Sequence, residues 1–503
     1  MSINRNIVAS YLGNAWAVLI QIAFVPVYIK YLGIEAYGLI SAYALLQVLM
    51  SLLDMGLTPT LTREMARFMA GARSVGQVRT LLGTVELFFL GLGLLIFGAV
   101  VFSAPWLAEN WLKVETLRIP TIVWAFYLMG AIIILRWLVG LYRGVLTGTQ
   151  RLVWLNGTNA AFDTLRGAGV VLVLLWISPT IEAFFLYQGC ITLIELAVVH
   201  WKAWFFLPGQ DKPRFSIVAL RRIWRFSAGL TMISLLGVLM MHTDKMLLSK
   251  MLALKAFGYY ALASSVAGSL NLLIGPISGV AYLRLTELVA HGNTAALAKA
   301  YHRFAQMLTL TLAPSALVLA LFSDRILMLW IQDDATVVAT AQLVSLLAVG
   351  AMLSGFMNIP NSLLLAYGNT TFMILLYSVF VLVFVPAVYV GVSEYGAVAA
   401  AYAWISVNAC CVALAVPLMH TKLLPREQWR WYRQDVAFPG LAALAATYAV
   451  HFLAPVRTAH EHWTNLIVVA LALLFAFTAA TAASPLGREI VAWVWLRFSK
   501  PRK

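Results

Sequence analysis

The sequence contains few charged residues and few cysteines. Asp, Glu, Lys and Arg make up 11% of its 503 residues, whereas 62% are hydrophobic and the mean hydropathy is +0.87. A soluble protein of this length cannot bury so much apolar surface, so these proportions exclude a water-soluble α/β enzyme and predict that much of the chain lies in lipid. The three cysteines, Cys190, Cys410 and Cys411, lie in apolar stretches without metal-ligand spacing. They are predicted to be buried thiols rather than parts of a disulfide framework or a metal site.

Catalytic motifs are absent from the sequence as well. It contains no phosphate-binding glycine loop, no H-E-x-x-H sequence and no nucleophile–base set. We therefore expect neither an enzymatic activity nor a cofactor. The net charge of +15 would suggest a nucleic-acid partner for a soluble protein. In so apolar a chain it is instead expected from basic loops on the cytoplasmic side of a membrane, and no nucleic-acid partner is predicted.

Long apolar runs dominate the chain, and fourteen of them have the length of about 20 residues that crosses a bilayer. The predicted spans are 7–29, 38–60, 81–103, 118–140, 153–177, 182–205, 223–248, 257–283, 303–323, 337–359, 370–391, 397–419, 435–455 and 463–482. They predict an all-α, polytopic membrane protein with two six-helix bundles, at 1–207 and 223–420. A basic cytoplasmic linker at 208–222 joins the bundles, and 421–503 holds two extra membrane helices and a basic cytoplasmic tail.

The orientation follows from the distribution of Lys and Arg between the loops. One side of the predicted topology receives most of them, including those of the linker and the tail. The other side receives only Lys30, Lys113, Arg118, Lys250, Lys255, Arg325 and Arg457. Because basic loops stay in the cytoplasm, both termini are predicted to be cytoplasmic. No A-x-A-like cleavage site follows the first span, so this span is expected to be retained.

The loop from Leu61 to Leu81 has a pattern of its own. Apolar residues recur there at helical spacing, with four arginines between them. This pattern predicts an amphipathic helix on the cytoplasmic leaflet, and an ordinary basic connector is the alternative.

An internal repeat links the two predicted bundles. The segment "KYLGIEAYGLISAYALL" begins at Lys30, and "KMLALKAFGYYALASSV" begins 220 residues later at Lys250. The alignment places Tyr37 on Phe257 and Gly38 on Gly258. Each segment joins the first and second span of a six-span unit, so the two units are expected to share one orientation, with the substrate path between them.

Several charged or polar residues lie inside the predicted spans or at their ends. Asp163 and Arg166 lie near mid-depth in the span 153–177, and their i,i+3 spacing lets them pair. Because a charge facing lipid is costly, both should face the bundle interior or a water-filled cavity. The other such residues are Asp54, Glu86, Arg136, Glu195, His242, Asp244, Lys245, Asn271, Asn358 and Asn361.

Two interpretations of these residues stay open. They either tie helices together or line a transport path. The predicted path residues are Arg136, Asp163, Arg166, Asp244, Lys245, Asn271 and Asn358. Along such a path the arginines would bind an anionic ligand, and Asp163 or Asp244 would carry a coupling ion.

Three stretches carry a resemblance to a known family. They are "YLGIEAYGLI" from Tyr31, "LLDMGL" from Leu52 with Arg63 shortly after it, and "TDKMLLSKMLALKAFGYYALA" from Thr243. Together with the span count and the two bundles, they make nearly the whole chain resemble the Wzx-type polysaccharide flippases. These flippases belong to the multidrug/oligosaccharidyl-lipid/polysaccharide exporter superfamily.

The resemblance implies a flippase in the bacterial inner membrane. Its substrate would be an undecaprenyl-pyrophosphate-linked oligosaccharide, namely a repeat unit of O-antigen, capsule or exopolysaccharide. The two bundles would move it by alternating access, and an ion gradient would supply the energy because the sequence has no ATP site. The implied partners are the bilayer and the lipid-linked oligosaccharide, with a polysaccharide polymerase and a chain-length regulator as further candidates.

Three other functions compete with this one. A small-molecule or drug exporter of the same superfamily would need an acidic site for organic cations, which the intramembrane arginines do not favour. A membrane polysaccharide polymerase or glycosyltransferase would need a long external loop with catalytic groups, and the predicted external loops are short. A non-transporting assembly scaffold is the third alternative.

Overall fold

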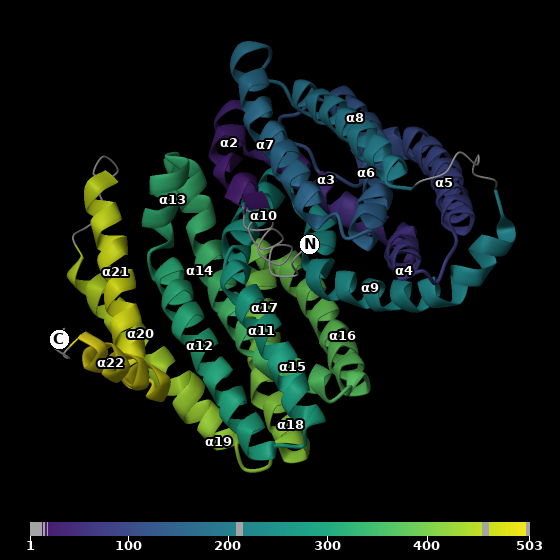
Figure 1. Cartoon of the computed structure of the whole chain (residues 1–503). Coiled ribbons are helices and arrows are strands. Elements are labelled where there is room, and N and C mark those ends of the chain that lie inside the picture. The colour runs from purple at the N-terminus through teal and green to yellow at the C-terminus, as the bar shows by residue number, and fades with distance from the viewer. Residues whose placement is uncertain (1–12, 14–15, 18, 208–214, 455–461, 499–503) are drawn as a thin grey trace. The chain divides into compact units, whose positions relative to one another are not determined.

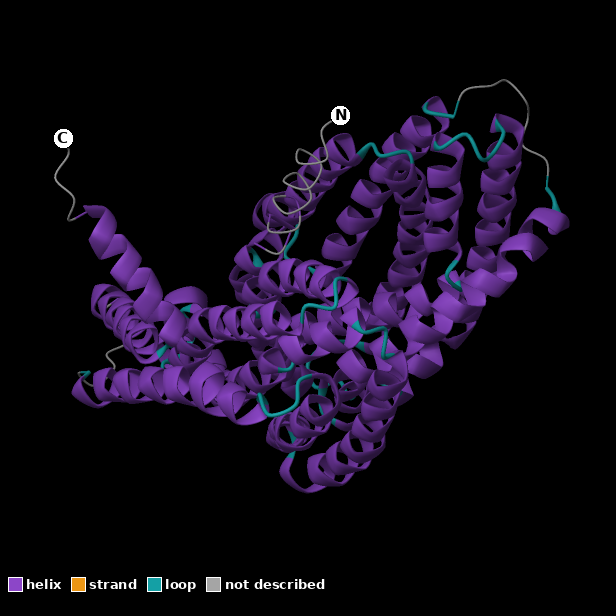
Figure 2. Cartoon of the chain, turned by 60° about the horizontal axis from the view of Figure 1, so that its bottom comes forward, coloured by secondary structure: helices purple, strands orange, loops and turns teal. Residues whose placement is uncertain are grey.

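The computed structural model describes residues 13, 16–17, 19–207, 215–454 and 462–498. These residues form helices joined by short loops, as Figure 2 shows, and they contain no strand apart from one isolated bridge between Lys113 and Ala253. The prediction of an all-α protein is therefore confirmed. The helices group into two compact units, Met1–Gly258 and Tyr259–Lys503.

The first unit contains the helices from α2 to α9 (Figure 1). They are α2 (Val25–Leu32), α3 (Ile34–Ser51), η1 (Leu52–Asp54), α4 (Leu57–Met69), α5 (Val75–Asn110), α6 (Ile119–Gly148), α7 (Leu152–Trp176), α8 (Ile181–Phe205) and α9 (Ile217–Met251). The next helix, α10 (Leu254–Gly268), begins in this unit and ends in the second.

The second unit contains the remaining helices. They are α11 (Asn271–Ala290), α12 (Thr294–Leu321), α13 (Ser323–Ile331), α14 (Asp334–Phe356), α15 (Asn358–Ala366), α16 (Thr370–Tyr395), α17 (Ala397–Cys410), η2 (Cys411–Ala415), α18 (Val416–Leu423), α19 (Gln428–Arg430), η3 (Trp431–Ala437), α20 (Phe438–Leu453), α21 (His462–Ala483) and α22 (Pro485–Phe498). Both η2 and η3 are π-helical turns inside longer helices.

Twelve helices of the described residues are long and apolar enough to cross a membrane, and a shorter apolar helix runs from Leu19 to Leu32. Helix α9 covers the predicted span 223–248. The prediction of a polytopic protein with about fourteen membrane helices is therefore confirmed. Some boundaries were wrong: the predicted span 257–283 is divided between α10 and α11, and residues 217–222 of the predicted linker already belong to α9.

Parts of three predictions lie outside the described residues. They concern the start of the span 7–29, the linker from 208 to 214, and the two termini. The proposed bundle limits also stay a prediction. Residues 223–258 belong to the first compact unit, whereas the sequence assigned them to the second bundle.

The helix ends follow from local sequence. Ser74 starts α5 with a capping box, because its hydroxyl accepts from the Gln77 N–H and the Gln77 side chain accepts from the Ser74 N–H. Helices α8, α14 and α12 have simpler caps, in which one side-chain oxygen accepts one backbone N–H. The capping residues are Thr180, Asp333 and Asn293, respectively. These caps satisfy N–H groups that the first helical turn leaves unpaired.

The loop from Leu61 to Leu81 does not form the single amphipathic helix that was predicted. Helix α4 ends at Met69, and α5 begins at Val75. Leu61 and Met65, which were expected to enter the leaflet, are fully buried in a core formed with α5 and α6. The apolar face of α4 is therefore covered by protein, and the spacing of its apolar residues reflected this core contact.

The buried carboxylate of Glu64 fastens α4 to the turn that follows it. Arg67 Nη1 donates to its Oε1 at 3.0 Å, and Arg73 Nε donates to its Oε2 at 2.7 Å. Burial alone would raise the pKa of Glu64, but the hydrogen bonds and charges of the two arginines outweigh it and lower this pKa below its usual range. A lowered folded-state pKa means that the carboxylate stabilises the fold above its unfolded pKa, and that this contribution is lost as the pH falls through the folded value.

Glu64→Gln should therefore destabilise the protein at neutral pH, by about 1–3 kcal/mol for the lost charge-assisted hydrogen bonds. The deficit should shrink as the pH falls below the ordinary Glu pKa of about 4.3, and it should vanish below the lowered folded-state pKa, where the wild-type carboxylate is protonated too. Thermal unfolding in detergent at both pH values measures the effect, with the exposed Glu115→Gln as the control. An equal deficit at both pH values would contradict this account.

Residues related by the internal repeat contact one another in the first unit. A Cβ added to Gly38 of α3 would lie 2.4 Å from the Leu254 carbonyl oxygen of α10. A Cβ added to Gly258 would lie 2.5 Å from the Ile34 carbonyl oxygen. Ile34 and Leu254 have the same 220-residue offset as Gly38 and Gly258, so the contact is reciprocal. Glycine at both positions lets the backbones of α3 and α10 approach this closely.

Glu35, in the first turn of α3, fixes the loop that precedes α6. Its carboxylate accepts the backbone N–H groups of Glu115 at 2.6 Å and Thr116 at 2.9 Å. The same loop accepts from α10, because the Leu254 N–H donates to the Lys113 carbonyl at 2.7 Å. The carboxylate thereby satisfies N–H donors of a loop that belongs to no helix or strand.

Helix α12 lies at the centre of the second unit. It packs against α11, α14, α20 and α21, and the α20–α21 pair joins it through a core rich in alanine. The small side chains of Ala443, Ala472 and Ala476 are fully buried at these crossings. One prediction fails in this unit: Cys410 is exposed, as is Cys190 in the first unit. An apolar stretch does not distinguish protein-facing from outward positions.

Candidate functional site

Helices α6, α7 and α8 of the first unit hold five charged side chains, which we call the charged cluster. They are Arg136, Arg143, Asp163, Arg166 and Glu195. The two arginines of α6 are seven residues apart, and the pair of α7 is three apart, so each set shares one helix face. Helix α8 packs along both α6 and α7 and brings Glu195 between them.

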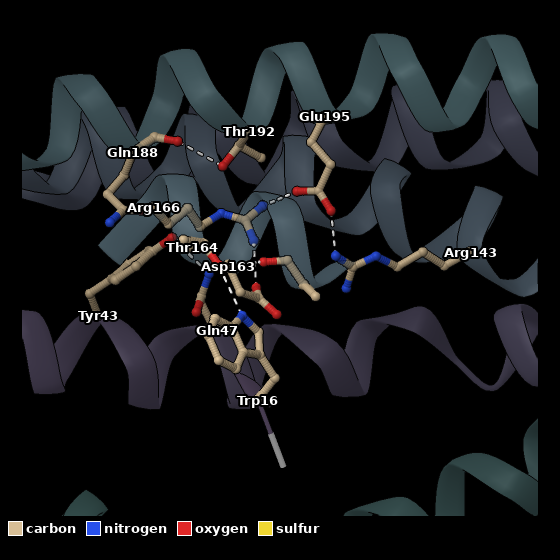
Figure 3. Close-up of polar contacts among 11 residues, drawn as sticks. Trp16, Tyr43, Gln47, Arg143, Asp163, Thr164, Arg166, Gln188, Thr192 and Glu195 are labelled. Carbon is tan, nitrogen blue, oxygen red and sulfur yellow. Dashed lines mark hydrogen bonds and ion pairs between the residues drawn. The ribbon is translucent and has the colours of Figure 1, made fainter. Parts of the chain in front are cut away.

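The fully buried carboxylate of Glu195 joins the cluster (Figure 3). Arg166 Nη2 donates to its Oε2, and Arg143 Nη2 donates to its Oε1. Arg166 Nη1 also donates to Asp163 Oδ1 at 3.2 Å. The predicted pairing of Asp163 with Arg166 is therefore present, and Glu195 is a second, more deeply buried partner.

Arg136 completes the positive side of the cluster. It lies within electrostatic reach of Arg166, Arg143 and Tyr43. Its Nε is buried without a hydrogen-bond partner among the described residues, and so are the Nε atoms of Arg143 and Arg166. Three guanidinium groups thus face two carboxylates, which leaves one positive charge in excess and several donors unused.

Polar side chains surround the charged cluster (Figure 3). Gln47 Nε2 donates to the Tyr43 hydroxyl at 2.7 Å on α3, and Trp16 Nε1 donates to Thr164 Oγ1 at 2.9 Å. On α8, Gln188 is buried and its Oε1 has no hydrogen-bond partner in the part of the chain that the structure describes. The arrangement offers a site where hydroxyl and amide groups flank guanidinium donors.

The other predicted path residues lie on other helices. Asp244 and Lys245 are half-buried near the end of α9. Asn271 and Asn358 belong to the second unit, where each begins a helix and donates to a carbonyl at the end of the preceding helix, Asn271 to Gly268 at 3.1 Å and Asn358 to Gly355 at 3.1 Å. The structure therefore brings Arg136, Asp163 and Arg166 together, whereas the roles of Asp244, Lys245, Asn271 and Asn358 stay predictions.

The remaining intramembrane candidates have local roles. Asp54 accepts from the Thr58 N–H at 3.2 Å and from its hydroxyl at 2.6 Å, at the start of α4. Glu86 lies 3.9 Å from His200 Nδ1. His242 is half-buried beside Asp244, and the Oδ1 of Asn361 is buried without a hydrogen-bond partner in the described segments.

Sequence reasoning missed Arg143. It placed this residue in a cytoplasmic loop, because the predicted span ended at residue 140, whereas α6 continues to Gly148. The seven-residue spacing from Arg136 was a usable signal, since it places both arginines on one helix face. The sequence also named Glu195 without assigning it a partner.

The charged cluster can hold an anion. Guanidinium groups bind oxyanions bidentately, and their hydrogen bonds are strongest where water is excluded. An oxyanion with several oxygens could use the Nε donors that the cluster leaves unused, and it would balance the excess positive charge. The hydroxyl and amide groups around it could bind uncharged polar groups of the same ligand.

Fold and site together define a class: a multi-pass helical membrane protein with a buried cationic cluster between its helices. The family described as "Polysaccharide biosynthesis protein" matches residues 3–289, which is more than half of the chain. The chain belongs to this family. A relative from Shigella flexneri named "Putative O-antigen transporter" is 22% identical over 430 residues, which cover 84% of this chain and 99% of the relative.

Solved structures share the fold. The lipid II flippase MurJ in an inward closed conformation is similar with a TM-score of 0.70 at 14% identity, over 97% of this chain and 100% of that chain. An inward-facing multidrug resistance MATE family transporter of the MOP superfamily is similar with a TM-score of 0.61 at 13% identity, over 82% and 94% of the two chains. The fold is thus the one that flippases and transporters of this superfamily use.

Proposed function

We propose that this chain moves a lipid-linked oligosaccharide, joined through pyrophosphate to undecaprenol, from one leaflet of the bacterial inner membrane to the other. The oligosaccharide is a repeat unit of O-antigen, capsule or exopolysaccharide. The family match and the named O-antigen relative support this cargo, and the fold supports transport by alternating access. Both termini lie in the cytoplasm in this proposal, as the basic loops favour.

The charged cluster is the observation that carries the proposal. A pyrophosphate cannot enter hydrocarbon unless other groups replace its hydration, and buried guanidinium donors provide such a replacement. Arg136 is the first candidate contact, because its Nε is buried without a partner among the described residues, whereas Arg143 and Arg166 are already paired with Glu195. An organic cation would be repelled by the same excess positive charge.

The other parts of the path remain proposals. Asp163 is the better of the two candidates for ion coupling, because its side chain is 28% exposed and pairs with Arg166. Asp244 is the second candidate, and Lys245, Asn271 and Asn358 would line other parts of the path. A polysaccharide polymerase and a chain-length regulator would be the partners that use the exported unit.

Arg136→Gln should slow the leaflet-to-leaflet movement of an undecaprenyl-pyrophosphate-linked oligosaccharide in liposomes by about tenfold or more, the effect of one lost charge-assisted hydrogen bond. Arg136→Lys should recover part of the rate, since lysine keeps the charge but not the bidentate geometry. Initial rates in proteoliposomes with equal amounts of folded protein measure both variants.

Arg118→Gln is the matched control, because it removes an exposed arginine from the start of the same helix. It should leave the rate unchanged. If the Arg136→Gln variant moves the lipid at the wild-type rate, Arg136 has only a structural role, and the main support for the pyrophosphate site is lost.

A further inference from the structure

A second buried group of ionisable side chains lies in the second unit, and transport by the charged cluster does not use it. The ring of His302, on α12, is 2% exposed. Its Nδ1 contacts Asp435 Oδ2, and its Nε2 lies 2.9 Å from Glu427 Oε2. Asp435 is fully buried in the π-helical turn η3, whereas the Glu427 side chain is 30% exposed.

The geometry of this group fixes the number of its protons. A neutral imidazole has one N–H group, and an ionised carboxylate can only accept. Both ring nitrogens of His302 face carboxylate oxygens, so the two hydrogen bonds require two protons. The group therefore holds one proton more than a neutral histidine with two ionised carboxylates. An imidazolium between the two carboxylates satisfies both contacts.

The same group connects three elements of the second unit. Gln306, one turn after His302 on α12, donates from Nε2 to Asp435 Oδ1 at 2.7 Å. Its Oε1 accepts from Ser484 Oγ at 3.1 Å and from the Leu486 N–H at 2.8 Å, where α21 passes into α22. Gln306 of α12 thus contacts residues just before α20 and just after α21, and ties this helix pair to α12. A π-helical turn such as η3 often marks a functional position, because it interrupts regular helix pairing.

Other titratable and charged groups surround His302. Those in its immediate surroundings are Tyr301, His420, Arg430, Tyr432, Asp435 and Glu427. Charged groups on neighbouring helices are paired with each other or exposed. Arg284 and Glu287 of α11 pair at 2.7 Å, and Arg488 and Glu489 of α22 are exposed. The two carboxylates are therefore the ionisable groups in direct contact with both ring nitrogens of His302.

We propose that His302, Asp435 and Glu427 form a buried proton-binding site that fastens the α20–α21 pair to α12. When the proton leaves, His302 can donate to only one carboxylate, and the contact to the other is lost. Glu427 is the residue that separates, because it is partly exposed and its Oε2 already lies 3.9 Å from Arg430 Nη1. Asp435 stays in place through Gln306. The attachment is complete at low pH and loosens at its Glu427 end, before α19 and η3, as the pH rises.

The test uses hydrogen–deuterium exchange in nanodiscs over residues 428–437, which include η3. After correction for the intrinsic pH dependence, wild-type exchange should accelerate by about tenfold or more between mildly acidic and mildly alkaline pH, as one charge-assisted hydrogen bond is lost. Glu427→Gln should remove this dependence. Its amide can donate to the free Nε2 of a neutral His302, so both contacts survive without the extra proton. Glu489→Gln, an exposed change on α22, should behave like the wild type.

Two results would overturn the proposal: pH-independent exchange in the wild type, or a pH dependence that Glu427→Gln leaves intact. A second measurement covers the case in which this variant does not fold. The ¹⁵N spectrum of histidine-labelled wild type should show one imidazolium signal that disappears at alkaline pH and is missing in His302→Asn. The absence of such a signal would also overturn the proposal. None of these measurements involves the cargo, so they stand apart from the test of the proposed function.

Discussion

Replacing Glu195 with alanine should cost about 3–5 kcal/mol of stability, because it leaves two arginines without their shared partner. Glu195 is fully buried and accepts from both Arg143 and Arg166. Arg166 would keep only Asp163, which lies closer to the surface. Glu195→Gln should cost less, since the amide oxygen can still accept one hydrogen bond. Thermal unfolding of the purified variants in detergent measures the losses.

Glu182→Ala is the control for this change, since it removes a carboxylate from the first turn of the same helix, α8. It should remain within about 0.5 kcal/mol of the wild type. If Glu195→Ala unfolds at the wild-type temperature, then the pairing of Glu195 with the two arginines is not what holds α6, α7 and α8 together at this point.

The second large effect is expected at the crossing of α3 and α10. Gly38→Ala and Gly258→Ala each place a methyl group within 2.5 Å of a backbone carbonyl oxygen, which cannot move aside as a flexible side chain could. Each should cost about 2–3 kcal/mol or more, which is typical of overpacking against a rigid neighbour. The double variant should cost less than the sum, because both methyl groups push the same two helices apart.

Gly98→Ala provides a matched control, because a Cβ at this helical glycine of α5 meets nothing within 4 Å. It should be neutral or stabilising by up to about 1 kcal/mol, since alanine favours helix more than glycine does. Unfolding temperatures of the three single variants and the double variant in detergent measure these effects. If Gly38→Ala and Gly98→Ala have the same stability, the close contact between α3 and α10 is not maintained in the membrane.

Hydropathy predicted the helices well and their ends less well. The span 153–177 and helix α7 (Leu152–Trp176) agree within a residue, because the sequence changes abruptly between apolar and polar residues at both ends. The span 257–283 was wrong as a single helix, since the break between α10 and α11 is only two residues long, Ser269 and Leu270, and lies inside a long, mainly apolar run. The buried face of α4 was assigned to lipid because amphipathic spacing is the same for both environments.

The charged cluster was partly predictable. The spacing of Asp163 and Arg166 predicted their pairing, because residues three apart share a helix face. Glu195 is 29 residues from Arg166, and the sequence holds no local signal for a contact between two different helices. The same limit applies to His302, which is 125 and 133 residues from its two carboxylate partners. Such contacts depend on how the helices pack.

The most direct test of the central claim is the movement of matched lipids by wild-type protein in liposomes. One lipid carries its oligosaccharide on undecaprenyl pyrophosphate, and the other carries the same oligosaccharide through an uncharged ether. The account predicts that the protein moves the pyrophosphate lipid between leaflets well above the rate in protein-free liposomes, and the ether lipid hardly at all. Equal rates for the two lipids, or no movement of the pyrophosphate lipid by folded protein, would contradict it.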